Sequence, residues 1–274
     1  MKFPKKPPLA LTIAGSDCSG GAGLEADLKT FAAHDVYGMA AVTCVVAETP
    51  RRVVSIQAIR PAIVAEQLAC CLGGLDGVAV KTGMLFSAAI IRAVRAALGQ
   101  RPTSVRRLIV DPVMVATSGA RLLREDAVRA LREFIGEHAD LVTPNLDEAA
   151  ILDNGRRPAT RGAMEDAAAR IAARFGCAVL MKGGHLHDSR GAPDFFIEGA
   201  EGFWMEARRV RGIATHGTGC AFSAAIAANL ARGCPLRDAV RRAKRYLTSA
   251  IRGSLNFGPW MALHHQHGDF PLGE

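Results

Sequence analysis

The chain has 274 residues, of which 49% are hydrophobic and 22% charged, and this balance suits one globular unit with a sizeable core. Its net charge is +8, but only 5% of the residues are aromatic. We therefore expect a soluble protein that attracts anions and does not bind nucleic acid, because no nucleic-acid motif accompanies the scattered arginines. No apolar run reaches the roughly 18 residues of a membrane span, so no membrane partner is expected.

Cysteine usage indicates the compartment. Seven cysteines occur without any C-x-x-C pair or zinc-ligand spacing, at positions 18, 44, 70, 71, 177, 220 and 234. An odd number in this pattern predicts neither a disulfide framework nor a structural zinc site. A reducing cytoplasm fits best, and the adjacent Cys70 and Cys71 are expected in the core side of a helix.

Short apolar runs alternate with amphipathic segments along the chain. The runs are 9–15, 40–47, 77–83, 107–113, 139–145 and 177–184, and apolar residues recur at helical spacing in 61–72, 87–99, 124–136 and 162–175. This alternation predicts an α/β fold with three layers, in which helices cover both faces of a mainly parallel central sheet.

The last third of the chain breaks the alternation. Segment 185–214 contains FFIEGAEGFWMEARRV and predicts a hairpin with a glycine-containing turn, and helices are expected over 219–232 and 236–252. No linker or repeat divides the sequence, so we predict a single domain over 1–274, with terminal tails at 1–8 and about 260–274. Within the tail, HHQH (264–267) is interpreted as solvated, and VRRAKRYL (240–247) as a helix with a solvated cationic face.

Polar residues close most of the predicted strands. They are Asp17, Glu48, Lys81, Asp111, Asn145 and Lys182. In parallel sheets ligands bind beyond the carboxyl ends of the strands, so the functional site is expected there. Asn145 and Glu148 would share one side of a first helical turn, either as a capping box or as oxygen ligands that organise a hydrated Mg²⁺.

The glycine-rich stretch AGSDCSGGAGLEADLKT (14–30) allows several interpretations. It is not a P-loop, because Gly21 and Ala22 stand where lysine and serine or threonine are needed. A dinucleotide fingerprint fits in part, but its first glycine lies too far from the strand end. The glycines either permit close helix packing or bring the backbone to a ligand, with Asp27 one turn into the following helix.

The stretch THGTGCAFSAA (215–225) places two glycines and a cysteine where an alanine-rich helix begins. The first-turn amides, from about Gly217 to Cys220, and the helix dipole would together bind an anion. The same dipole predicts a lowered pKa for the Cys220 thiol, which would then act as a base near neutral pH. The alternative is that Cys220 only fills a buried space.

Six blocks in one order and spacing carry a family resemblance. AGSDCSGGAGLEADLKTF, VKTGM, DPVM, TPNLDEA, VLMKGGH and HGTGCAFSAA together resemble the hydroxymethylpyrimidine/phosphomethylpyrimidine kinases of thiamine biosynthesis, which belong to the ribokinase-like superfamily. The likeness covers roughly 9–252. It implies the ribokinase-like fold, commonly a homodimer, and ATP·Mg²⁺-dependent phosphorylation of 4-amino-5-hydroxymethyl-2-methylpyrimidine and then of its monophosphate.

The resemblance also implies roles for particular residues. The pyrimidine pocket would be lined by Gly15, Asp27, Glu48, Met84 and Val113. The metal and phosphates would lie among Asp111, Asn145 and Glu148, with Lys182, Asn145 and Thr218 at the nucleotide. Catalysis would involve Lys182, the anion site of Gly217, Thr218, Gly219 and Cys220, and Cys220 as the base.

Position 48 departs from the family pattern, in which glutamine is frequent. An ionised carboxylate only accepts hydrogen bonds, whereas an amide also donates, and the difference bears on substrate preference. Pyridoxal kinase is the near alternative, and a sugar kinase fits less well because Cys220 stands where that group has aspartate. A non-catalytic pyrimidine sensor is disfavoured by the presence of Lys182, Asn145, Glu148 and the GTGC loop.

Overall fold

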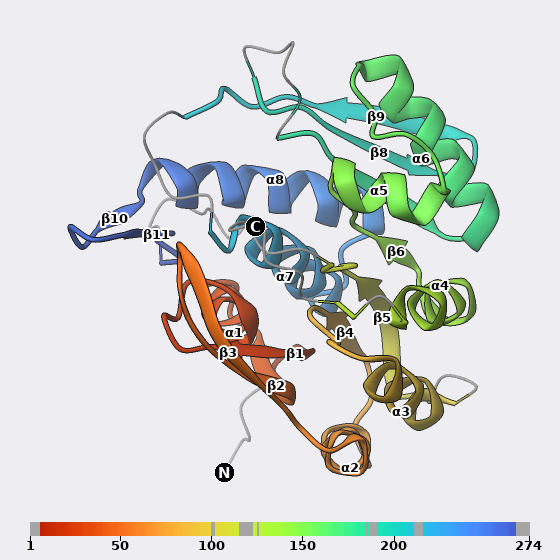
Figure 1. Cartoon of the computed structure of the whole chain (residues 1–274), viewed down its shortest axis with the longest axis vertical. Helices are drawn as coiled ribbons and strands as arrows, with labels where there is room; N and C mark the ends of the chain where they lie inside the picture. Colours follow the sequence, from red (N-terminus) through yellow and green to blue (C-terminus); the bar gives the residue numbers. More distant parts are fainter. Residues whose placement is uncertain are drawn as a thin grey trace.

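The computed structural model describes residues 6–99, 102–114, 123–124, 126–184, 186, 191–210 and 216–266. Its main sheet has nine strands in the order β3-β2-β1-β4-β5-β6-β7-β8-β9 (Figure 1). The strands are β1 Leu9–Asp17, β2 Tyr37–Thr49, β3 Arg52–Ala58, β4 Val78–Thr82, β5 Val105–Val110, β6 Leu141–Val142, β7 Ala178–Lys182, β8 Asp194–Glu198 and β9 Glu201–Met205. A separate two-stranded ribbon pairs β10 Leu255–Asn256 with β11 Met261–Ala262.

Helices cover both faces of this sheet. They are α1 Gly23–Ala32, α2 Pro61–Leu72, α3 Ala88–Leu98, α4 Ala127–His138, α5 Leu146–Asp153, α6 Arg161–Phe175, α7 Thr218–Ala231 and α8 Leu236–Arg252. One apolar core lies between the sheet and α2 to α6, and a second lies between the sheet and α1, α7 and α8. The predicted three-layer α/β fold is confirmed.

The two cores explain why the central strands are apolar throughout. On β1, Leu11 and Ile13 contribute to the first core and Ala10 to the second, because neighbouring residues of a strand point to opposite faces. Ala79 and Ala178 repeat this small-residue pattern on β4 and β7. The small side chains allow the alanine-rich α7, buried from Ala221 to Ala231, to pack closely on the middle of the sheet.

Strand direction divides the sheet into a centre and two edges. β2, β1, β4, β5, β6 and β7 run parallel, whereas β3 pairs antiparallel with β2, and β8 and β9 form an antiparallel hairpin beside β7. The hairpin in 185–214 was predicted, and Gly199 in its turn has a φ of 61°. The edge strand β3 was not, because its largely exposed residues give no apolar run.

Three expectations about the surface are wrong. Cys70 is exposed on α2, because it lies on the side of that helix away from Val64 and Leu68. His265 is buried against Thr30 and Tyr246, so the interpretation of HHQH as solvated is wrong for this residue. Lys244 on α8 is buried as well, because Asp194 accepts a hydrogen bond from it at 2.6 Å.

Some sequence features fall outside the described residues, namely Thr215 of the THGTGC block, His185 of the VLMKGGH block and His267 of HHQH. Among the helices of the described part of the chain, none is long and apolar enough to cross a membrane.

Candidate active site

A cavity of about 510 Å³ opens where the central strands end. Its walls include residues from β1, β2, β4 and β7, residues that directly follow β5, and the first turn of α7. They come together because the parallel strands end at one edge of the sheet. Of the residues predicted from the sequence, it is lined by Gly15, Glu48, Met84, Asp111, Val113, Asn145, Glu148, Lys182, Gly217, Thr218, Gly219 and Cys220. Asp27 is the exception.

Glycines bring the two loops of the site into contact. Gly217 is the N-cap of α7 with a φ of 77°, and a Cβ there would lie 1.8 Å from the backbone oxygen of Gly21. A Cβ on Gly15 would lie 2.7 Å from the Cys44 sulfur. The glycine-rich stretch 14–30 therefore packs against the loop at the start of α7, and neither loop has room for a side chain at these positions.

The start of α7 forms the predicted anion site. The first hydrogen bond of the helix runs from the amide of Ala221 to the carbonyl of Gly217, so the amides of Gly219 and Cys220 lie before the helical ladder. Both residues line the cavity, and the positive end of the helix dipole lies at this turn. A Cβ on Gly219 would stand 3.3 Å from the Lys182 ammonium, which places a cation beside the same turn.

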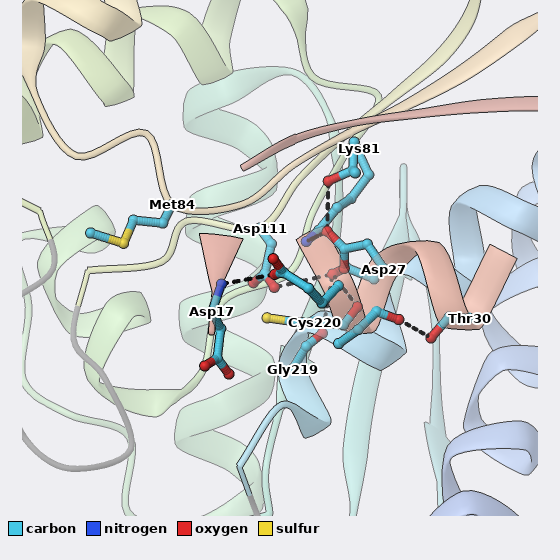
Figure 2. Close-up of polar contacts among 12 residues, drawn as sticks. Asp17, Asp27, Thr30, Lys81, Met84, Asp111, Gly219 and Cys220 are labelled. Carbon is cyan, nitrogen blue, oxygen red and sulfur yellow. Dashed lines mark hydrogen bonds and ion pairs between the residues drawn. The ribbon is translucent and has the colours of Figure 1, made fainter. Parts of the chain in front are cut away.

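The predicted low pKa of Cys220 is wrong for the protein without ligands. Burial raises the pKa of the thiol to about 11, and the negative charges of Asp27 and Asp111 add to this effect. Lys81 acts in the opposite direction but does not overcome burial. Figure 2 shows the Cys220 sulfur beside Gly219 at the start of α7, with both aspartates nearby. The helix dipole does not offset the desolvation of the thiol.

Asp27 lies beneath the cavity and forms a buried ion pair. The Lys81 ammonium contacts one carboxylate oxygen at 2.7 Å, the Thr12 hydroxyl donates to the same oxygen at 2.6 Å, and both charged side chains are fully buried (Figure 2). The predicted contact of Asp27 with the pyrimidine pocket is therefore replaced by Lys81, which does line the cavity. Although burial lowers the pKa of Lys81, the charges of Asp27, Cys220 and Asp111, together with the hydrogen bond to Asp27, more than reverse this effect.

A second charged group surrounds Asp111. Lys182 and Thr143 donate hydrogen bonds to one of its carboxylate oxygens at 2.8 and 3.1 Å, and Ser223 donates to the other at 3.1 Å. Glu148 lies close to this group. Burial raises its pKa to about 7, the charge of Asp111 adds to this effect, and the charge of Lys182 opposes it. Two buried carboxylates in one place favour a divalent cation.

The predicted capping box on α5 is present. The Asn145 side chain accepts from the amides of Asp147 and Glu148, each at 2.9 Å, and Glu148 accepts from the Asn145 amide at 2.8 Å. The amide oxygen of Asn145 is thus committed to the helix, whereas the carboxylates of Asp111 and Glu148 line the cavity. An oxygen-only donor set of this kind fits Mg²⁺, which retains several of its waters.

At the other side of the cavity Glu48 lies near Asp17 and His216. Burial, Asp17 and Glu25 raise the pKa of Glu48 to about 7, against the opposing effect of His216. For Asp17, burial by itself would raise the pKa, but hydrogen bonds from His216, Ser19 and Ala22 lower it to about 2. Sequence reasoning placed Asp17 and Lys81 at strand ends but gave them no role, and it missed His216 and Lys244, whose positions only tertiary contacts reveal.

The fold has three layers around a mainly parallel sheet. In its cavity an anion site at the start of a helix lies with a buried pair of carboxylates. This combination defines a ribokinase-like phosphotransferase. Residues 17–265 match the model of one family within this class, described as phosphomethylpyrimidine kinase. The chain belongs to that family.

Relatives agree with this assignment. The chain is 44% identical over 262 residues to the hydroxymethylpyrimidine/phosphomethylpyrimidine kinase of Rhizobium meliloti, covering 94% of this chain and 97% of that one. Among solved structures, an ADP complex of Bacillus subtilis pyridoxal kinase gives a TM-score of 0.85 at 35% identity, covering 95% and 98%. A phosphomethylpyrimidine kinase from Clostridium difficile gives 0.77 at 34% identity, covering 88% and 98%.

Proposed function

We propose that the protein transfers the γ-phosphoryl group of ATP to the hydroxymethyl group of 4-amino-5-hydroxymethyl-2-methylpyrimidine, and then phosphorylates the monophosphate to the pyrophosphate. The observation that carries this proposal is the single cavity in which a pocket for a planar ring, an anion site and a cation-binding carboxylate pair lie together. Membership of the family and the sequence identity to kinases of that name support the choice of substrate.

In this proposal the ring lies among Gly15, Glu48, Met84 and Val113. Because Glu48 has a pKa of about 7, its carboxyl group is protonated in a large fraction of molecules at neutral pH. A protonated carboxyl both donates and accepts hydrogen bonds, as an amide does. Glu48 can therefore pair with the exocyclic amine and a ring nitrogen of the pyrimidine, in the place where glutamine is frequent in the family.

Phosphoryl transfer depends mainly on positioning and on neutralising charge. The amides of Gly219 and Cys220 would hold the transferred group, and Lys182 would contact the nucleotide phosphates. Asp111 and Glu148 would hold Mg²⁺, with Asn145 within reach through water, and Thr218 would lie at the nucleotide. When bound, Mg²⁺ supplies positive charge against the phosphates.

Cys220 is the proposed base for the hydroxymethyl proton. With a pKa of about 11, only about one thiol in 10⁴ is ionised at pH 7. The proton therefore leaves late, when the oxygen already bonds to phosphorus and its acidity has risen. It passes to the thiolate form of Cys220 and gives the neutral thiol, and Lys81, whose charge lowers the pKa of Cys220, stabilises that thiolate before the transfer.

Pyridoxal phosphorylation is the second candidate activity. The TM-score of 0.85 to Bacillus subtilis pyridoxal kinase favours it, because the cavity of that fold accepts another hydroxymethyl-bearing heteroaromatic ring. The decisive assay couples ADP release to a detected product and compares hydroxymethylpyrimidine, its monophosphate and pyridoxal in parallel with ATP·Mg²⁺. Pyrimidine turnover with a higher kcat/KM than pyridoxal is expected, and the reverse order would reject the proposal.

Glu48→Gln tests the specificity residue in the same assay. We expect the ratio of kcat/KM for the pyrimidine to that for pyridoxal to change, because a carboxyl group that is partly ionised at neutral pH is replaced by an amide that cannot ionise. An unchanged ratio would remove Glu48 from the specificity pocket.

We also propose a homodimer and a cytoplasmic location, the latter because all seven cysteines are free.

A further inference from the structure

Three potential metal ligands come together at the pyrimidine side of the cavity. They are Asp17 at the end of β1, Glu48 near the end of β2 and His216 immediately before Gly217, the N-cap of α7. One ligand atom from each lies within 4.8 Å of the other two. All three residues line the cavity, and Asp17 is only 1% exposed. The proposed phosphoryl transfer assigns no role to Asp17 or His216.

The spacing suits ligands of a common ion. Nε2 of His216 lies 2.8 Å from Oδ2 of Asp17. Two neighbouring ligands that each lie about 2.0–2.1 Å from a metal are themselves about 3 to 3.5 Å apart, so a metal can replace the shared proton with only a small movement. To bind the same ion, the Glu48 carboxylate has to move closer to the other two ligand atoms. Its side chain is only half-buried.

Surrounding groups hold two of the ligands in place. Asp17 accepts hydrogen bonds from the amides of Ser19 and Ala22, each at 2.8 Å, and these fix the carboxylate orientation. The His216 ring lies against Gly21, where a Cβ would stand 2.8 Å from ring atom Cδ2. Partners of this kind orient the ligands in protein metal sites and strengthen binding.

Charge also favours a cation at this position. The carboxylates of Asp17 and Glu48 lie close together, and Glu25 adds a third, which accepts hydrogen bonds from the Ser16 hydroxyl and the Asp17 amide. Lys29, which lies on the same helix as Glu25, donates to the carbonyl of Gly20. A divalent ion between Asp17 and Glu48 removes their repulsion.

The donor atoms select the kind of ion. Mg²⁺ takes oxygen ligands, and the carboxylate pair of Asp111 and Glu148 provides them elsewhere in the cavity. A set of two carboxylates and an imidazole instead suits late first-row divalent metals, among which Zn²⁺ binds more tightly than Co²⁺ at most such sites. The two groups of residues therefore differ in the metals they prefer.

We propose that Asp17, Glu48 and His216 form a binding site for Zn²⁺ and related late first-row divalent metals, and that metal bound there excludes the pyrimidine. The first half is independent of the enzymatic activity. The exclusion of substrate rests on the proposed function, because it requires Glu48 to contact the ring.

Calorimetric titration of the full-length, chelator-treated protein with ZnSO₄ tests the site, in buffer that contains excess Mg²⁺ and no nucleotide. We expect one Zn²⁺ per chain, and affinity at least about tenfold lower in both His216→Gln and Glu48→Gln. Cys220→Ser is the matched control, because it removes a sulfur that lines the same cavity and leaves the three ligands in place, and it should bind Zn²⁺ as the parent does. Unchanged affinity in both ligand variants would overturn the proposal.

Two further measurements test whether the imidazole binds the metal and whether the metal excludes the pyrimidine. The absorption spectrum of the Co²⁺-loaded parent should change on His216→Gln, and an identical spectrum would show that the imidazole is not a ligand. Kinetic inhibition by Zn²⁺ should be relieved by raising the pyrimidine concentration and not by raising ATP·Mg²⁺. Zn²⁺ binding without pyrimidine turnover would reject the proposed function alone, whereas turnover without Zn²⁺ binding at these residues would reject the metal site alone.

Discussion

At the scale of single residues, the site is built on charges that the fold buries. Asp27 and Lys81 are fully buried and Asp111 nearly so, whereas Cys220 and Lys182 are partly buried where they line the cavity. Low local dielectric makes each charge sensitive to its neighbours. The resting state of Cys220 is therefore set by its surroundings as much as by its place on a helix.

Replacing Cys220 tests its role as the base. Cys220→Ala should lower kcat about 10²- to 10⁴-fold without unfolding the protein, because general-base catalysis contributes that much. A base acts in its deprotonated form, so the kcat of the parent should rise with pH from 7 to 9, toward the thiol pKa of about 11, and the rise should be absent in the variant. A folded alanine variant with near-normal turnover would contradict the role.

The Asp27–Lys81 pair should show strong coupling in a double-mutant cycle. Lys81→Met or Asp27→Asn alone leaves one buried charge without its partner and should cost about 3–5 kcal/mol in the free energy of unfolding. The double variant should cost clearly less than the sum. Urea unfolding measures all three, with Asp126→Asn in the exposed Arg124–Asp126 pair as a control expected to change stability by less than about 1 kcal/mol. Additive costs would mean that the pair is not coupled.

At the scale of elements, helix starts and chain segments position the charged groups. The capping box holds Glu148 at the first turn of α5, facing Asp111, although a buried carboxylate is unfavourable there. The segment that follows α8 returns to α1, where His265 contacts Thr30, one turn along that helix from Asp27. Both arrangements predict a dependence of stability on pH.

Glu148 should destabilise the protein as pH rises in the absence of metal. Its pKa is raised from 4.5 to about 7, so the folded state holds the proton more tightly, and this stabilising effect is complete below about pH 4.5 and lost as pH rises through 7. Glu148→Gln should therefore lose less unfolding free energy than the parent between pH 5 and 8. Mg²⁺ should raise the Tm of the parent more at pH 8 than at pH 5, and parallel pH curves for parent and variant would contradict this account.

The contribution of His265 to stability should be lost at low pH instead of at high pH. Burial, with the charges of Lys29 and His264, lowers its pKa to about 4, so the folded state favours the neutral ring. The stability that this provides is present above about pH 6.5 and is lost as pH falls toward 4, by up to about 3 kcal/mol. Because His34 is also buried with a lowered pKa, the test compares chemical unfolding of the parent and His265→Gln, in which the decline should be smaller. Equal declines would assign it to other groups.

At the scale of the whole molecule, one edge of the sheet is suited to pairing with a second copy of the chain. β3 is an edge strand, and Val45 on β2 and Val54 on β3 are exposed apolar side chains near it. Exposed strand edges with apolar side chains pair readily with other chains. This edge is the part of the described surface where we expect the proposed dimer to form.

Val54→Asp should shift the protein from dimer toward monomer, because it places a charge at the expected interface. Light scattering after size-exclusion chromatography gives the mass directly. Leu255→Asp is the control, since Leu255 is also exposed but lies on the β10–β11 ribbon. A parent that is monomeric at all concentrations, or a Val54→Asp variant that remains dimeric, would contradict the expected interface.

The sequence alone determined the α/β fold, most of the strand ends and the family. Apolar runs, helical spacing and glycine-flanked helix starts are local signals, and six motifs in order were specific enough to identify relatives. Glu48, Asp111, Glu148 and Lys182 were predicted as strand-end or helix-start residues and do line one cavity.

Only the tertiary structure decided the protonation and the partners of these groups. Helix-dipole reasoning predicted a low pKa for Cys220, but burial and neighbouring carboxylates raise it. Asp27 was expected at the ring and instead pairs with Lys81, 54 residues away, and His216 contacts Asp17 from 199 residues away. Desolvation and such long-range contacts depend on which segments the fold brings together, and no local pattern of residues contains that information.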